Sequence, residues 1–183
     1  MTILDKKLIV LSLLLIFMSL LCFIVWYDYW YITSYYKMEP VSYQHIVLNI
    51  PDYKITYTKN ELKEEISKLY NISHCYEEID NLEPTTTGTT KLLLRKVYIR
   101  KNLSLQSYAT TYAHELTHIK YNTANETYTN YMSLIILYES ENIQLQQIAL
   151  NEMKAIIKGR ESGTVYDCGY YLLNYLKEKG EVI

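Results

Sequence analysis

Residues 114–118 read His-Glu-Leu-Thr-His, and their types and spacing suggest zinc chemistry. On a helix, His114 and His118 stand four residues apart and project from one face, where two imidazoles can bind one zinc ion. Glu115 lies beside them and can take a proton from a water on that metal. The preceding segment favours a helix, because Ser104 or Asn102 can cap it and no Pro or Gly interrupts it. The pattern predicts a zinc metallopeptidase; the competing interpretation is an exposed helix on which these side chains only meet solvent.

A catalytic zinc site also needs a third protein ligand and keeps a fourth position for water. The residues after His118 lack the Gly and third His of the metzincin pattern, so a carboxylate from the next helix is expected instead. Three carboxylates are candidates, in this order: Glu126, Glu139 as the runner-up, and Glu141. Thr123 and Glu126 also fit a helix capping box, which is the structural alternative for Glu126.

The motif, followed by Asn125-Glu126-x-x-Thr129-Asn130, resembles the gluzincin branch of the zincin metallopeptidases. In that branch a second helix carries an Asn-Glu-x-x-Ser-Asp-like pattern, and the resemblance implies that Glu126 is the third zinc ligand. The chain departs from thermolysin-like enzymes in its shorter gap before Glu126 and in Asn130, which stands where those enzymes carry Asp. Asn130 is four residues after Glu126, so it faces the same side of a helix and is expected to orient a ligating His.

The short gap is more similar to an uncharacterised family of bacterial membrane-anchored zincins. That family has a Ser-Tyr-Gly-like segment that opens a late apolar helix, and residues 165–173 are a loose match. The resemblance covers about Leu105 to Leu137 and, weakly, Val165 to Leu176. It implies a bacterial source and an α+β, mostly helical zincin-like domain with a small β-sheet beside the active-site helix.

The expected reaction is hydrolysis of a peptide or protein substrate. Zinc would lower the pKa of its water toward about 7, and Glu115 would pass the proton to the leaving amine. The oxyanion needs a donor besides the metal; Tyr166, in the late match, is the candidate, with His45 and His74 as alternatives. His74 is more typical of an ordinary surface histidine. The alternative function is an inactive zincin-fold module that binds a metal or a partner at the membrane surface, although a structural zinc site has no need of Glu115 as a base.

The N-terminal segment from Leu8 to Trp26 carries no charged residue. At 1.5 Å per residue it would span about 28 Å, close to a hydrocarbon core of about 30 Å. Lys6 and Lys7 precede it, and aromatic residues follow it at 27 and 29–31. The pattern predicts an uncleaved transmembrane helix, with the N-terminus in the cytoplasm and the catalytic domain outside. A cleaved signal peptide is the alternative, but the apolar core is longer than usual and no Ala-x-Ala-like site ends it.

Composition adds bounds on the rest of the 183-residue chain. Residues 1–36 form the expected anchor and interfacial segment, and residues 37–183 are long enough for one domain with its own core. The formal net charge of −2 gives no indication of nucleic-acid binding, and nothing indicates an oligomeric state. The three cysteines form no framework and are not expected to bind zinc, but Cys75 and Cys168 could pair.

Hydrophobic patterning predicts the elements that must position the motif. A capping box at Thr58 and Glu61 opens a helix to about Tyr70. The other expected elements are β-prone runs at 44–50 and 53–57, a loop at 80–90, a strand at 91–101, and helices at 123–139, 142–158 and 166–179. Zincins place an edge strand beside the active-site helix, where an extended peptide can add as a further strand, and the Val97–Ile99 run is the candidate.

Overall fold

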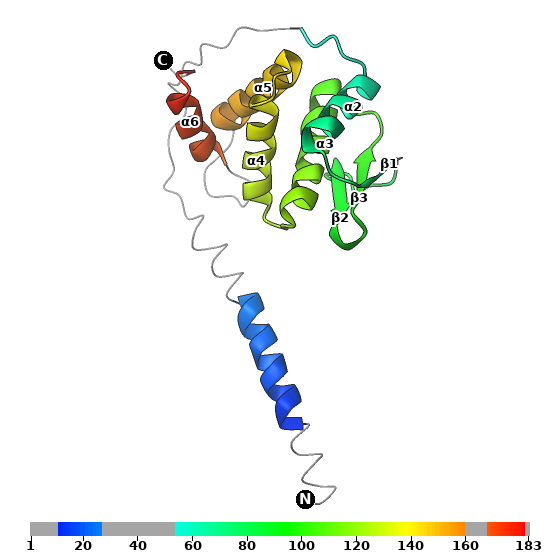
Figure 1. Cartoon of the computed structure of the whole chain (residues 1–183), viewed down its shortest axis with the longest axis vertical. Coiled ribbons are helices and arrows are strands. Elements are labelled where there is room, and N and C mark those ends of the chain that lie inside the picture. Colours follow the sequence, from blue (N-terminus) through cyan, green and yellow to red (C-terminus); the bar gives the residue numbers. More distant parts are fainter. Residues whose placement is uncertain (1–10, 27–53, 160–167, 182–183) are drawn as a thin grey trace, which may run out of the picture. The chain divides into compact units, whose positions relative to one another are not determined.

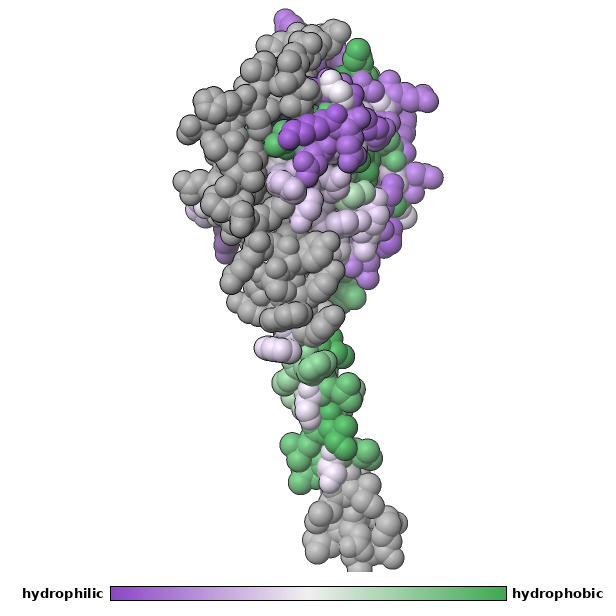
Figure 2. All heavy atoms as spheres, turned by 90° about the vertical axis from the view of Figure 1, so that its left-hand side faces the viewer, coloured by the Kyte–Doolittle hydropathy of each residue, from purple (hydrophilic) through white to green (hydrophobic). Residues whose placement is uncertain are grey.

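The computed structural model describes residues 11–26, 54–159 and 168–181. The chain divides into two compact units, Met1–Glu39 and Pro40–Ile183. In the first unit, residues 11–26 form a helix (Figure 1). Leucine, phenylalanine and other apolar side chains are exposed along this helix, as Figure 2 shows.

This helix corrects the sequence-based expectation of a transmembrane segment. Its 16 described residues rise about 24 Å, whereas a hydrocarbon core is about 30 Å thick. Within the described parts of the chain, no helix is both long enough and apolar enough to cross a membrane. The prediction of a transmembrane helix over residues 8–26 is therefore wrong where the structure describes that segment; residues 8–10 lie outside the described residues.

The second unit is α+β and mostly helical. Its elements are α2 (Lys59–Tyr70), β1 (Cys75–Ile79), β2 (Gly88–Lys91), the 3-10 turn η1 (Leu92–Leu94), β3 (Lys96–Arg100), α3 (Leu105–Tyr121), α4 (Glu126–Tyr138), α5 (Ile143–Gly159) and α6 (Gly169–Glu178). Helix α3 is central, because α2 and the sheet pack against it on one side and α4 and α5 on the other (Figure 1). The β-prone run at 44–50 lies outside the described residues, and residues 54–57 form no strand.

Helices α2, α3 and α4 begin where short polar side chains satisfy their first backbone amides. Thr58 and Glu61 form the expected capping box at the start of α2. Ser104 caps α3 by accepting a hydrogen bond from the Ser107 amide, whereas Asn102 lies before the helix with a positive φ of 59°. Asn125 caps α4, so Thr123 does not form the capping box that was the structural alternative for Glu126. Glu126 is instead the first residue of the helix, which leaves its carboxylate available.

The sheet has the strand order β1-β3-β2, with β1 parallel and β2 antiparallel to β3. The Val97–Ile99 run lies on the central strand, and Val97 and Ile99 are fully buried, so the prediction that it forms the edge beside α3 is wrong. The edge strand beside α3 is β2, whose Gly-Thr-Thr-Lys sequence falls partly in the expected 80–90 loop. Its lack of apolar residues follows from its position, because an edge strand contributes little to the core.

The core forms where α3 meets its neighbours. Tyr108, Ala109, Tyr112, Ala113 and Leu116 on α3 are fully buried. They belong to one continuous cluster with apolar residues of α2, β3, α4, α5 and α6. Since α3 is held on several sides, the side chains in its last two turns have well-defined positions. Cys75 is exposed, Cys168 is buried, and the two do not form a disulfide.

Candidate metal centre

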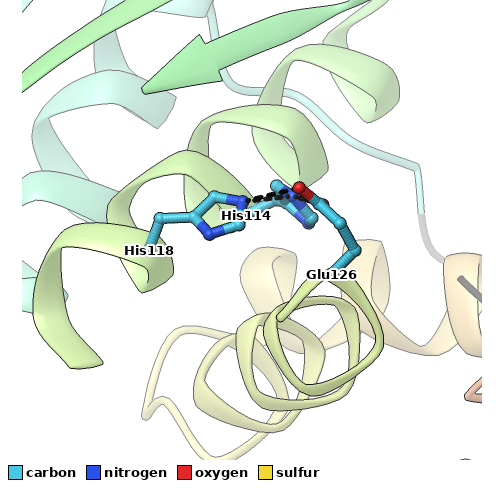
Figure 3. Close-up of side chains that lie close together, drawn as sticks. All are labelled: His114, His118 and Glu126. Atoms are coloured by element: carbon cyan, nitrogen blue, oxygen red, sulfur yellow. Dashed lines mark hydrogen bonds and ion pairs between the residues drawn. The ribbon is translucent and has the colours of Figure 1, made fainter. Parts of the chain in front are cut away.

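The turn between α3 and α4 brings Glu126 onto the face of α3 that carries the two histidines. Helix α3 ends at Tyr121, its C-cap Asn122 adopts the left-handed conformation (φ 48°, ψ 49°), and only three further residues precede Glu126. Asn tolerates this conformation better than most residues, so the chain can reverse at once. Figure 3 shows the result: the side chains of His114 and His118 on α3 and of Glu126 at the start of α4 point toward one another.

The three facing side chains lie close enough together to share a single metal ion. The Nε2 atoms of His114 and His118 are 3.0 Å apart. The Glu126 carboxylate oxygens lie 2.9 Å from His114 Nε2 and 3.5 Å from His118 Nε2. Ligands bound to zinc at about 2.0–2.2 Å in a tetrahedral arrangement are roughly 3.3–3.5 Å from each other. The donor set, two imidazole nitrogens and one carboxylate, therefore fits a zinc ion in both chemistry and size.

Hydrogen bonds made by Nδ1 orient both imidazoles so that Nε2 faces the other metal-binding side chains. The Nδ1 of His118 lies 2.7 Å from the Thr123 carbonyl oxygen, which can only accept, so Nδ1 donates, and in the neutral ring Nε2 carries the lone pair that a metal would bind. The Nδ1 of His114 lies 2.9 Å from Asn130 Oδ1, an arrangement that gives His114 the same tautomer. A carbonyl or amide oxygen behind each ligating His is the usual outer arrangement of zinc sites.

Charge is strongly coupled within this cluster. Burial disfavours the Glu126 carboxylate, but hydrogen bonds from His114 and His118 outweigh that effect and lower its pKa to about 2. Burial also disfavours a charged His118, but its hydrogen bonds to Glu126 and to the Thr123 carbonyl raise its pKa. Without a metal, the raised pKa favours a proton on His118, which would compensate the charge of the carboxylate. A metal cation would take the place of that proton, because ligating imidazoles must be neutral.

Glu115 lies beside the histidines and is held by the edge strand β2. Its side chain is only 5 % exposed, and burial raises the pKa of its carboxyl group. The Thr90 hydroxyl donates to Glu115 Oε2 over 2.7 Å and also lies 3.1 Å from the Glu115 carbonyl oxygen. Gly88 permits this approach, because a Cβ at that position would lie 2.9 Å from Glu115 Oε1.

A cleft of about 580 Å³ opens onto the metal-binding residues and Glu115. Its lining includes the threonine-rich segment Thr85–Thr90, Thr110 and Thr111 on α3, and side chains of α4 and α5. Among the described lining residues, the carboxylates are Glu115, Glu126 and Glu152, and there is no Lys or Arg. The cleft therefore has a negative charge that a bound divalent cation would partly neutralise.

The structure does not bring the other sequence-based candidates to this centre. Glu139 lies at the opposite end of α4, where it pairs with Lys179 (2.6 Å), and Glu141 is exposed after that helix. His74 is bound between Tyr112 Oη (2.6 Å) and the Ile72 carbonyl (3.0 Å), and it does not line the cleft. Tyr166 and His45 lie outside the described residues.

Sequence reasoning missed three residues that line the cleft together with Glu115: Gly88, Thr90 and Glu152. Gly88 and Thr90 come from a threonine-rich run for which the sequence predicts a loop, and Glu152 comes from the middle of α5. A glycine inside a β-branched run was the available signal, since it often marks a place where another part of the chain approaches closely. The comparison of this chain with protein-family models, with curated proteins and with solved structures found no match. Inference about its function therefore rests on the geometry of the site.

Proposed function

We propose that this protein is a zinc-dependent metallopeptidase of the gluzincin type, in which His114, His118 and Glu126 hold the metal. The observation that carries the proposal is that the two Nε2 atoms lie 3.0 Å apart and 2.9 and 3.5 Å from the Glu126 carboxylate oxygens, with the buried Glu115 next to them. Hydrogen bonds from the Nδ1 atoms of the histidines to Asn130 Oδ1 and to the Thr123 carbonyl support it, because they favour the tautomer that binds metal. A zinc ion held there would supply Lewis acidity, which activates water and polarises a carbonyl near neutral pH.

Glu115 is the proposed general base and acid. It follows His114 directly, so its carboxylate is at the edge of the metal cluster rather than in it. Burial raises its pKa and thereby makes it a better proton acceptor, while the Thr90 hydroxyl fixes one of its oxygens. The other oxygen can accept a proton from the attacking water and give it to the leaving amine.

Strand β2 is the proposed platform for an extended peptide. Among the described strands it pairs with β3 alone, so its other edge keeps backbone donors and acceptors for a further strand. Thr87 and Thr90 on this segment line the same cleft as His114 and Glu115. A peptide added along β2 would therefore present its carbonyl groups to the metal-binding face of α3.

Metal content is the first test. Zinc in the dialysed full-length protein should amount to about one ion per chain. Glu126→Gln should reduce the affinity by more than the 10–100-fold that is typical of losing an outer partner. Glu139→Gln, which alters the same type of residue at the far end of α4, is the matched control and should leave zinc binding unchanged. Equal loss in both variants, or no zinc in the folded parent, would refute the site.

Turnover is tested separately with a peptide library and Glu115→Gln. This variant keeps an oxygen that accepts from Thr90 but removes the group that takes the proton, so it should keep zinc and lose hydrolysis by at least about 100-fold. Zinc binding without hydrolysis in the parent would instead indicate the alternative function, a zincin-fold module that binds a metal or partner. Hydrolysis that persists in Glu115→Gln would assign the activity to another site or to a contaminant.

A further inference from the structure

The turn between β2 and β3 has a surface that the proposed peptidase chemistry does not use. We define the leucine tip as Lys91–Arg95, the η1 turn and the residues on either side of it. Leu93 is fully exposed, at 101 %, and Leu94 is 65 % exposed. Adjacent large apolar side chains with this exposure, at the end of a hairpin, are costly in water and mark an interaction surface.

The tip is held in a defined conformation. The Arg95 amide donates to the Leu92 carbonyl over 3.0 Å, and Arg95 adopts the left-handed conformation with φ 47°. The Arg95 carbonyl accepts a hydrogen bond from the Cys75 amide over 2.8 Å, and the Arg95 side chain donates from Nε to the Ser73 carbonyl over 2.8 Å. Because the turn is ordered in advance, insertion of the leucines elsewhere would cost little additional conformational entropy.

Positive charge surrounds the exposed leucines. Between Glu83 and Glu115 the sequence contains five Lys or Arg residues and no Asp or Glu. Two of the five, Lys96 and Lys101, form salt bridges with Glu77 and Asp80. Lys91 and Arg95, on either side of the leucines, form no salt bridge with a described residue.

We propose that the leucine tip inserts into the surface of an anionic lipid bilayer, with Leu93 and Leu94 among the acyl chains and Lys91 and Arg95 at the headgroups. Apolar residues flanked by basic ones match the layered chemistry of that surface. A protein partner is a poorer match, because two protruding side chains cover far less than the roughly 800 Å² per partner of a stable protein interface.

The leucine tip is next to the cleft that contains the metal-binding residues. Leu92, the first residue of η1, lines the cleft together with His114 and Glu115. A tip inserted in lipid would hold the cleft mouth next to the bilayer surface. If the proposed peptidase function holds, its substrates would then be chain segments that lie close to that surface. The lipid contact itself does not depend on the peptidase function.

The test uses the full chain with a fluorophore that reports the polarity around one position. Leu93→Cys is labelled in a Cys22→Ser/Cys75→Ser background, where Cys168 is protected by burial. The same label at the exposed position Asn60→Cys is the control. On phosphatidylcholine vesicles that contain phosphatidylserine, we expect a blue shift and quenching by nitroxide lipids at position 93 and neither at position 60. This comparison separates tip insertion from any lipid contact made by another part of the chain.

The charge requirement is tested with Lys91→Gln/Arg95→Gln. At roughly 1 kcal/mol per charge, the concentration of anionic vesicles needed for half of the spectral change should rise about 20–30-fold. Lys68→Gln/Lys177→Gln, which removes two exposed charges elsewhere, should have little effect. The proposal is overturned if the label at position 93 stays in water, if both labelled positions shift equally, or if the shift is the same on pure phosphatidylcholine. None of these outcomes bears on zinc binding or hydrolysis.

Discussion

Gly88→Ala is a sharp test of how β2 meets the helix that carries the metal ligands. A Cβ at position 88 would lie 2.6 Å from Thr111 Cγ2 and 2.9 Å from Glu115 Oε1, whereas carbon atoms in favourable contact are about 3.5–4.0 Å apart. The Thr111 side chain is β-branched and stiff on a helix, and Thr90 holds the Glu115 carboxylate. Neither neighbour can easily move away, so β2 itself must shift by about 1 Å.

Two opposing effects decide the size of the change. Overpacking of this kind costs about 1–3 kcal/mol, while replacing Gly by Ala gains about 0.4–1 kcal/mol by restricting the unfolded chain. The cost of overpacking is larger than the gain from restricting the unfolded chain, so Gly88→Ala should lower the free energy of unfolding by about 1–2 kcal/mol. Urea denaturation of the metal-free protein measures this as a lower midpoint at an unchanged slope.

A double-mutant cycle identifies the cause. Thr111→Ser removes the Cγ2 methyl group that makes the closest contact but keeps the hydroxyl, which donates to Thr87 over 3.2 Å. In that background Gly88→Ala should cost at least about 0.5 kcal/mol less than in the parent. The reasoning is refuted if Gly88→Ala is neutral or stabilising, or if the two substitutions are strictly additive.

Three further outcomes are expected. Asn130→Ala should weaken zinc binding by about 10–100-fold in a competition titration with a chelator. Asn130→Asp keeps an oxygen that accepts from His114 and should bind zinc within a few-fold of the parent. Equal losses of affinity in the two variants would contradict the orienting role. The buried Tyr70 hydroxyl lies 2.7 Å from Thr117 Oγ1, which donates to the Ala113 carbonyl, so Tyr70→Phe should cost about 1 kcal/mol in urea denaturation. Thr117→Val leaves that hydroxyl buried without a partner and should cost more, about 1–3 kcal/mol, and the reverse order would show that the pairing is misassigned. If the protein is a peptidase, Glu152→Lys should reduce cleavage of lysine- and arginine-containing peptides relative to acidic ones by about fivefold, because it reverses a charge in the lining of the cleft. Glu141→Lys, outside the cleft, is the control. The same shift in both variants would assign the effect to the overall charge of the protein.

The two histidines of the site could be predicted from the sequence, because helix periodicity depends only on residues close together in the chain. Residues four apart share a helix face, so the spacing alone was enough to place His114 and His118 together on α3. The capping residues Thr58 and Ser104 were equally readable, because a cap depends on a hydrogen bond to an amide three residues away. The expected transmembrane span is the corrected part, because no helix in the described part of the chain is long and apolar enough to cross a membrane.

Contacts between elements could not be read in the same way. Three carboxylates were open as the third ligand, and the left-handed turn at Asn122 brings Glu126 to the histidines while Glu139 is carried to the far end of α4. Periodicity likewise marked Val97 and Ile99 as strand residues but could not show that β3 is central and β2 is the edge. A repeating pattern reports which side chains share a face, whereas the faces that meet are decided by the packing of the whole core.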